Sequence, residues 1–232
     1  MNGAESLIRS FVGAGVDVCF ANPGTSEMHL VQAIDAVPEM RAVLTLFEGV
    51  CTGAADGYAR MRGTPALTLL HLGPGLGNGI ANLHNARRAA TPIINVVGNH
   101  ALYHLDYDAP LTSDIDTLAR NVSSWIKSDS SASSLAADGM AALQASLTAR
   151  AGSAGQIASL IVPVDACWSD APGVAEALSQ PRPAVVPADR IEAVAKQLDG
   201  DCVIVLDGAG LTPEAQVDAA RAAHASGARL MY

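Results

Sequence analysis

The stretch that most constrains the fold of this chain is residues 41–60, RAVLTLFEGVCTGAADGYAR. Its first half, residues 41–47, is apolar and rich in β-forming side chains, which predicts a buried strand of a parallel sheet. Its second half has the pattern of a helix. Glu48 stands between the two, at the carboxyl end of the predicted strand. Open α/β sheets bind their ligands at such strand ends, so the stretch predicts an α/β fold with a site near Glu48.

The helical half carries Gly49, Gly53 and Gly57 at four-residue intervals. Each glycine inside a helix costs about 1 kcal/mol relative to alanine, so we expect another backbone or a ligand to approach this glycine stripe closely. Asp56 and Arg60 lie in the same segment, and their charges exclude a membrane-dimer motif. Their spacing predicts an ion pair on the solvated side of the helix.

Two interpretations of Glu48 remain open from the residues alone. A helix N-terminus favours the charged carboxylate, whereas burial beside Phe47 and glycines favours the neutral acid. Glu48 is therefore either an exposed first-turn glutamate that stabilises the helix dipole or a ligand-binding acid.

Composition narrows the class of protein. The chain has 232 residues, half of them hydrophobic, and a formal net charge of −9, which argues against nucleic acid and anionic membranes as partners. Its four cysteines are far apart with no CxxC spacing, which favours reduced, buried thiols over a zinc site or a disulfide framework. The N-terminus has no signal core and no apolar run is long enough to span a bilayer, so a cytoplasmic protein is expected.

Alternating strand and helix patterns predict a parallel sheet with helices on both faces, in a first domain at residues 1–168. The expected strands are 16–21, 41–47, 65–71, 92–98, 122–127 and 157–164, and the expected helices are 2–14, 27–37, 49–60, 80–90, 114–120 and 130–150. Proline-rich residues 169–188 are expected to be a linker. Residues 189–232 then predict the incomplete start of a second α/β domain, with helices at 189–198 and 213–226 and strands at 202–206 and 229–232.

Two further loops at strand ends carry candidate residues. The first, NPGTSE, turns at Pro23 and Gly24, and Thr25 or Ser26 is expected to cap the next helix. The second follows His71 and holds four glycines in residues 73–79, whose backbone N–H groups we expect to face a ligand. It fits neither the dinucleotide fingerprint nor Walker A, so the sequence does not support FAD or NAD.

A third loop, residues 99–113, holds His100, His104, Asp106 and Asp108, whose spacing matches no metal-ligand pattern.

The motif LFEGVCTGAADGYAR closely resembles the pyrimidine-binding domain of thiamine-diphosphate enzymes, in particular the acetolactate synthase and benzoylformate decarboxylase group. The resemblance covers residues 1–168 and implies the thiamine-diphosphate-binding fold. It implies that Glu48 hydrogen-bonds N1′ of the cofactor's aminopyrimidine and so promotes removal of the C2 proton.

The same resemblance extends to the other loops. It implies that Pro23 and Gly24 face the cofactor and that Thr25 stands where a substrate-contacting serine does. In LLHLGPGLGN it implies that His71 is a catalytic acid–base that also meets the substrate, and that Gly75 and Asn78 belong to the cofactor loop. Acetolactate synthases commonly lack this histidine, and their Phe-Gln pair is absent from residues 99–113, where His100 and His104 remain candidates.

The function implied is the N-terminal part of a 2-keto acid decarboxylase or carboligase resembling acetolactate synthase. The alternatives are a benzoylformate-decarboxylase-like lyase, a non-catalytic subunit that needs a partner's diphosphate-binding domain, and a binding-only nucleotide domain. The family places Mg²⁺ and the diphosphate on a later domain, and Asp207-Gly208 lacks the leading glycine of that motif. The resemblance also implies a second subunit that shares the active site, in a homodimer or homotetramer.

Overall fold

The computed structural model describes residues 1–148, 155–179 and 185–232. Residues 1–148 and 155–179 belong to one compact unit, and residues 185–232 belong to a second. The two units are described in turn.

A six-stranded sheet forms the centre of the first unit, and every neighbouring pair in it is parallel. The strands follow the order β2-β1-β3-β4-β6-β5. Their bounds are β1 (Val18–Asn22), β2 (Arg41–Leu44), β3 (Ala66–Leu70), β4 (Ile93–Asn99), β5 (Trp125–Lys127) and β6 (Ile157–Pro163). The predicted α/β class with a parallel sheet is confirmed.

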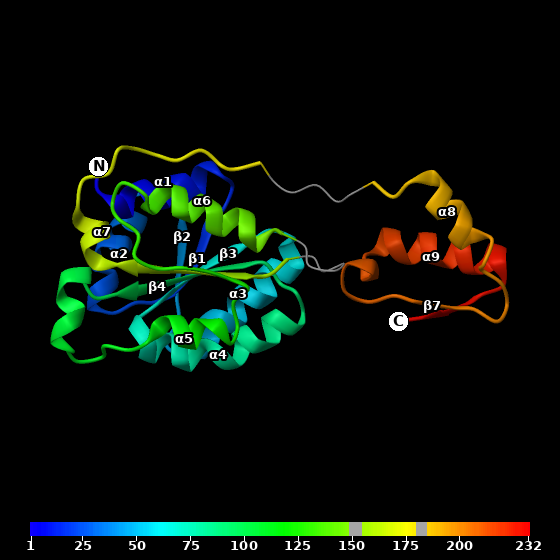
Figure 1. Cartoon of the computed structure of the whole chain (residues 1–232), viewed down its shortest axis with the longest axis horizontal. Helices are drawn as coiled ribbons and strands as arrows, with labels where there is room; N and C mark the ends of the chain where they lie inside the picture. The colour runs from blue at the N-terminus through cyan, green and yellow to red at the C-terminus, as the bar shows by residue number, and fades with distance from the viewer. Residues whose placement is uncertain (149–154, 180–184) are drawn as a thin grey trace. The chain divides into compact units, whose positions relative to one another are not determined.

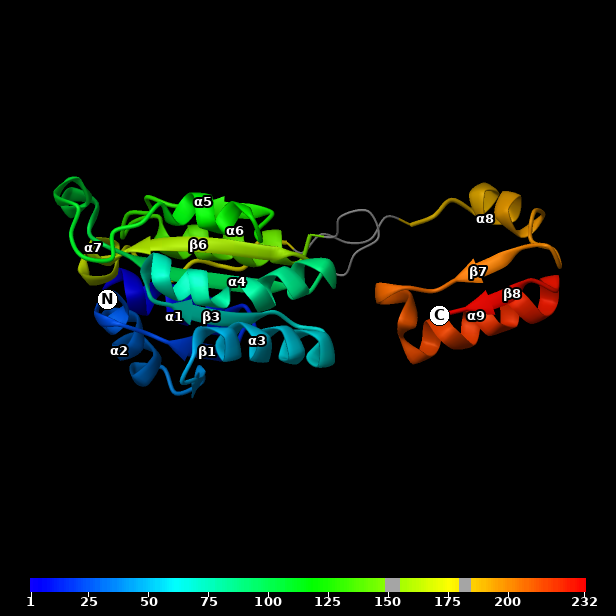
Figure 2. The same cartoon turned by 90° about the horizontal axis from the view of Figure 1, so that it is seen from below.

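Helices cover both faces of this sheet (Figures 1 and 2). One face carries α1 (Gly3–Gly13), α2 (Met28–Ala36), α6 (Leu135–Ser146) and α7 (Val164–Trp168). The other carries α3 (Glu48–Arg62), α4 (Leu72–Arg88) and α5 (Ile115–Arg120). The buried apolar residues accordingly form two clusters, one on each side of the strands.

The structure corrects the prediction that residues 41–47 form a buried strand. β2 ends at Leu44 and is one of the two edge strands of the sheet, so it has a single neighbour and most of its side chains are exposed. Leu44 and Leu46 are 70% and 92% exposed. The apolar sequence predicted the strand correctly, but strand order depends on distant pairings that a local pattern does not contain.

The glycine-rich residues 73–79 are also not a loop, because α4 begins at Leu72. Leu72 has φ +53°, which makes the sharp turn from β3 into the helix. The glycines allow close packing: a Cβ on Gly73 would lie 2.3 Å from Cβ of Ser113, and one on Gly79 would lie 2.9 Å from Thr52. Their role in the helix is therefore close approach to neighbouring side chains.

Two 3₁₀ helices lie in segments predicted as loops or caps, η1 (Thr25–Glu27) and η2 (Leu102–Tyr107). Neither Thr25 nor Ser26 caps α2, because the residue before that helix is Glu27. The predicted helix 130–150 is α6, preceded by turns, and residues 149–150 lie outside the described part of the chain.

Residues 169–179, expected to begin a linker, are hydrogen-bonded to the first unit. Gly3 N donates to the carbonyl of Ser169, and Ala175 N donates to Ser10 Oγ, at 3.0 and 2.9 Å. Gln144 Nε2 donates to the carbonyl of Ser179 at 2.9 Å. This segment therefore runs as a strap over α1 and α6, whereas residues 180–184 of the expected linker are outside the described ranges.

The second unit contains a two-stranded parallel sheet and two helices. Its elements are α8 (Ala188–Ala195), β7 (Val203–Val205), η3 (Gly208–Leu211), α9 (Pro213–Ser226) and β8 (Arg229–Met231). Most of its apolar side chains are exposed, and only Ala223 and Ala228 are buried among its described residues.

The three cysteines of the first unit, Cys19, Cys51 and Cys167, are buried and unpaired, and Cys202 in the second unit is partly exposed. Within the described ranges, no helix combines the length and apolar character needed to cross a membrane.

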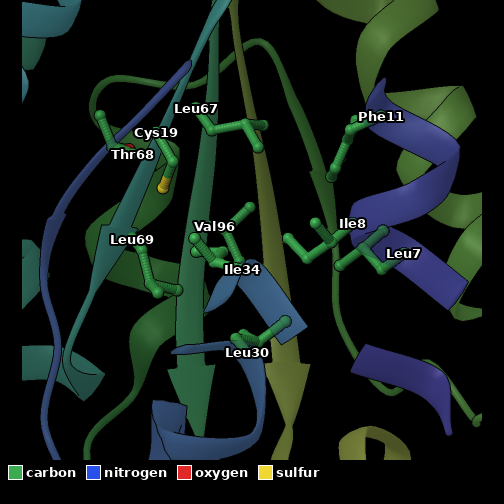
Figure 3. Close-up of a pocket in the computed structure, with 10 residues that line it drawn as sticks. All are labelled: Leu7, Ile8, Phe11, Cys19, Leu30, Ile34, Leu67, Thr68, Leu69 and Val96. Atoms are coloured by element: carbon green, nitrogen blue, oxygen red, sulfur yellow. The ribbon is translucent and has the colours of Figure 1, made fainter. Parts of the chain in front are cut away.

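The core between α1, α2 and the sheet encloses a small apolar cavity of about 10 Å³ (Figure 3). Leu7, Ile8 and Phe11 of α1 line it opposite the strand residues, and the volume is close to that of one water-sized sphere. It is a packing gap and too small to hold a ligand.

A buried chain of hydrogen bonds crosses the middle of the sheet. Thr68 on β3 donates to Asn95 on β4 at 2.7 Å, and Asn95 donates to Ser159 on β6 at 2.9 Å. All three residues are fully buried. Ser159 Oγ also bonds to Ser123 Oγ at 2.7 Å, so loss of Asn95 leaves Ser159 with a partner but removes the partner of the buried Thr68 hydroxyl.

We expect Asn95→Ala to lower the free energy of unfolding by about 1–3 kcal/mol, the usual cost of one buried polar group left unsatisfied, here the Thr68 hydroxyl. Urea titration followed by circular dichroism measures this change. The control is Asn85→Ala, at an exposed position of α4, which should change the free energy of unfolding by less than about 0.5 kcal/mol. Equal stability of the two variants would contradict the role given to this network.

Candidate functional site

The candidate site lies where β1, β3 and β4 end. These three strands are adjacent and parallel, so their carboxyl ends meet at one edge of the sheet. The segments that follow are η1 after β1, α4 after β3, and His100 after β4. α3 begins at the same edge, after β2, so Glu48 and His71 are brought to the same part of the fold.

Glu48 begins α3 and is half-buried. Its Oε2 accepts a hydrogen bond from Asn78 Nδ2 of α4 at 3.0 Å. The segment before it exposes Leu46 and Phe47, and Val50 after it is exposed as well. Glu48 thus offers a carboxyl group, oriented by an amide, beside an accessible apolar surface.

Gly75 lies between Glu48 and His71. A Cβ on Gly75 would lie 3.5 Å from His71 Cβ and 3.6 Å from Glu48 Oε1, so any larger side chain there would reach both residues. Gly75 N also donates to the His71 carbonyl at 2.8 Å. The structure therefore brings together the predicted residues Glu48, His71, Gly75 and Asn78.

His71 is the residue before α4, and its side chain is 21% exposed. Its Nδ1 lies 2.8 Å from Glu27 Oε2 and 3.3 Å from Ser26 Oγ. Gly24 is adjacent, because a Cβ there would lie 2.4 Å from His71 Nδ1. The predicted residue Gly24 is thus in the site, and it is glycine because the imidazole occupies the space that a side chain would fill.

Glu27 is a residue of the site that the sequence patterns did not reveal. Its side chain is fully buried, and Oε2 also accepts from Gly24 N at 2.7 Å. Oε1 has no hydrogen-bond partner among the described residues and faces β4 so closely that a Cβ on Gly98 would lie 1.7 Å from it. Gly98 could have indicated this contact from the sequence, because a lone glycine in an apolar strand indicates close approach by another group.

Other predicted residues lie outside this cluster. Thr25 is exposed on η1, and its neighbour Ser26, rather than Thr25 itself, places a hydroxyl near the imidazole. Pro23 is half-buried before Gly24. His100 and His104 contact each other with ring centroids 6.3 Å apart, and His104 contacts Tyr107 at 5.3 Å, in and beside η2.

The glycine stripe of α3 meets the expectation of close approach only in part. A Cβ on Gly53 would lie 3.1 Å from Asn82 Nδ2 of α4, whereas Gly57 faces open space. A Cβ on Gly49 would meet the ring of Phe47 in its own chain segment. Asp56 pairs with Arg60 at 2.7 Å as predicted. Asp56 is buried rather than solvated, and it also accepts a hydrogen bond from Thr91 at 2.6 Å.

Neighbouring thiols are held in the neutral form. Burial raises the pKa of Cys51 on α3 to about 12, and the charge of Glu48 adds to this effect although hydrogen bonds to Leu69 and Thr45 oppose it. Burial raises the pKa of Cys167 to about 12 as well, with Glu27 and Asp165 adding to it. Neither thiol supplies a nucleophile at neutral pH.

The arrangement supports acid–base chemistry. It provides a carboxyl group at Glu48, an imidazole at His71 and a buried carboxyl group behind that imidazole. In the part of the chain that the structure describes, no three His, Cys, Asp or Glu side chains lie close enough together to hold a metal ion.

Comparison with known proteins places the chain in a family. Residues 1–124 match the family model described as "Thiamine pyrophosphate enzyme, N-terminal TPP binding domain". The chain is 56% identical over 231 residues to the "Putative acetolactate synthase large subunit IlvX" of Mycobacterium tuberculosis, across 99% of this chain and 44% of that protein.

The benzoylformate decarboxylase of Pseudomonas aeruginosa is 32% identical over 112 residues, which cover 48% of this chain and 21% of that protein. The fold matches a solved thiamine-diphosphate-dependent 4-hydroxybenzoylformate decarboxylase of Rhodococcus jostii RHA1 with a TM-score of 0.78 and 22% identity, over 97% of this chain and 41% of that one. The chain spans less than half the length of these relatives.

We expect Gly98→Ala to destabilise the first unit by about 1–3 kcal/mol, the usual cost of overpacking, because the new methyl group would overlap Glu27 Oε1. Thermal unfolding measures the effect. The matched control is Gly13→Ala in α1, where a Cβ meets no atom within 4 Å and where alanine should be neutral or stabilising. A Gly98→Ala variant as stable as Gly13→Ala would show that Glu27 does not occupy this position.

Proposed function

Because this chain belongs to the thiamine pyrophosphate enzymes and carries their N-terminal TPP-binding domain, we propose that it supplies the cofactor-activating half of a 2-keto acid decarboxylase or carboligase. The observation that carries the proposal is the pair Glu48 and His71 at one edge of the sheet, with Gly75 in contact distance of both. The similarity to an acetolactate synthase large subunit and a benzoylformate decarboxylase supports this reaction class.

The residues at this edge fit the aminopyrimidine end of thiamine diphosphate. A ring nitrogen needs a carboxyl partner, and Glu48 is a half-buried one that Asn78 already orients. The ring itself needs apolar surface, and Leu46, Phe47 and Val50 expose it on either side of Glu48. We therefore assign Glu48 to the pyrimidine nitrogen, with Gly24, Gly75 and Asn78 around the cofactor and Pro23 shaping the turn.

Bound thiamine diphosphate supplies a thiazolium carbon that adds to the keto group and accepts the electron pair released on decarboxylation. In our proposal Glu48 holds a proton at the pyrimidine nitrogen. His71 gives a proton to the substrate or takes one from it, as a general acid–base. Ser26 Oγ lies 3.3 Å from His71 Nδ1, so we extend the proposed substrate contact from Thr25 to Ser26.

The remaining parts of the site are proposed to lie outside this chain. Support comes from the family resemblance, which places Mg²⁺ and the diphosphate on another domain. The apolar surface at Leu46, Phe47 and Val50 supports the proposed second subunit, because exposed apolar clusters mark interaction sites. A homodimer or homotetramer of the full-length protein would bury this surface and bring a diphosphate-binding domain to Glu48.

A benzoylformate-decarboxylase-like lyase is the more specific candidate. The observation that favours it is the histidine at the end of β3, buried against Glu27, since acetolactate synthases commonly lack this residue. An imidazole held in this way suits a reaction in which the substrate gains a proton after carbon dioxide leaves.

We expect Glu48→Gln to slow cofactor activation in the natural enzyme by about 100- to 10,000-fold, because the amide keeps the size of the side chain but loses its acidic proton. The measurement is C2–H/D exchange of bound thiamine diphosphate by quenched NMR. Glu39→Gln, at an exposed position of the same unit, is the control. Exchange at the wild-type rate in the Glu48 variant would remove Glu48 from the mechanism.

We expect His71→Ala to reduce turnover of accepted 2-keto acids by about 100- to 10,000-fold with little change in cofactor affinity, because the variant loses an acid–base group and no cofactor contact. Steady-state kinetics and cofactor titration separate the two effects. His84→Ala, on the exposed side of α4, is the control. If the His71 variant turns over every accepted substrate like the wild type, His71 is a structural residue.

A further inference from the structure

We propose that Glu27 is the positioning residue for His71: its buried carboxylate holds the imidazole with a proton on Nδ1 and leaves Nε2 as the basic nitrogen. The importance of this tautomer for catalysis rests on the role proposed for His71. The tautomer itself is a property of this chain that can be measured without cofactor or substrate.

The contacts of Glu27 Oε2 define where the proton lies. This oxygen accepts a hydrogen bond from Gly24 N at 2.7 Å and lies 2.8 Å from His71 Nδ1. A distance of 2.8 Å requires one hydrogen between the nitrogen and the oxygen. An oxygen that already accepts a backbone N–H suits the ionised carboxylate, so the hydrogen belongs on Nδ1.

Ser26 is the competing partner of the same nitrogen, but it fits less well. Its Oγ is 3.3 Å from Nδ1, longer than the contact with Glu27. If Ser26 donated to Nδ1, that nitrogen would turn a lone pair towards Oε2 at 2.8 Å. Two lone pairs at that distance repel, so the Ser26 hydroxyl accepts from the ring or turns towards other groups.

The burial of Glu27 explains why this contact is strong. The side chain is fully buried, and Oε1 has no hydrogen-bond partner among the described residues. A buried carboxylate with one unpaired oxygen depends on its remaining partners, and the charge-assisted bond to imidazole is the only one from a side chain that can become positive. When Nε2 takes up a proton, the positive ring therefore remains against a fixed negative charge.

Two glycines make this geometry possible. A Cβ on Gly24 would lie 2.4 Å from Nδ1, and a Cβ on Gly98 would lie 1.7 Å from Oε1. The missing side chain of Gly24 leaves room for the imidazole, and that of Gly98 leaves room for the carboxylate. The hydrogen bond of one ring nitrogen sets which nitrogen of a histidine remains basic, so this packing assigns the basic role to Nε2.

The test is ¹⁵N NMR of the full 232-residue chain labelled at histidine, at about pH 8.5, where free imidazole is neutral. His71→Gln identifies the His71 signals by their loss. We expect a pyrrole-type signal for Nδ1 and a pyridine-type signal for Nε2 in the wild type. In Glu27→Gln we expect both signals to move towards the average of two tautomers, because the amide can donate or accept.

Ser26→Ala is the matched control, because it removes the other neighbour of Nδ1, and it should leave the wild-type signals in place. Glu27→Met, which fills the same volume without charge, replaces Glu27→Gln if the latter does not fold. A protonated Nε2 in the wild type, or a wild-type tautomer that persists in the Glu27 variants, would overturn the proposal. A wild-type Nδ1–H that depends on Glu27, combined with unimpaired turnover in His71→Ala, would uphold the positioning role and reject only the proposed function.

Discussion

The buried carboxylate of Glu27 is the interaction on which the arrangement of the site depends. A charge removed from water requires hydrogen bonds. The carboxylate of Glu27 obtains them from Gly24, in the turn after β1, and from His71, the residue that follows β3. Its other oxygen lies against β4. One side chain thus connects three neighbouring strands, so the position of His71 is fixed by the body of the sheet and does not rely on a surface loop.

The two parts of the site differ in how firmly the first unit holds them. His71 is held by the buried carboxylate of Glu27, whereas Glu48 has an exposed amide partner and stands beside exposed apolar side chains. This difference suits the proposed division of work. The proposed acid–base group, His71, is positioned within this chain, whereas the proposed cofactor-activating group, Glu48, faces an exposed apolar surface.

The sequence predicted the α/β class and most strands and helices, because alternation of apolar runs and helical patterns is a local property. The motif around Glu48 and the LLHLGPGLGN segment also located four residues that the structure brings together: Glu48, His71, Gly75 and Asn78. Three features depend on contacts between distant segments and were therefore missed. β2 is exposed because of strand order, α4 begins at Leu72 because its glycines pack on Ser113 and Thr52, and Glu27 is buried because β3 and β4 end beside it.

The position of Gly75 has a consequence for directed evolution of an enzyme built on this domain. A single methyl group there would touch both the side of the site that carries Glu48 and the side that carries His71. If Glu48 holds the cofactor as proposed, a library that enlarges this residue to change substrate preference would disturb the Glu48 side in the same step. Under the proposed function, selectivity and cofactor activation would therefore be coupled at residue 75.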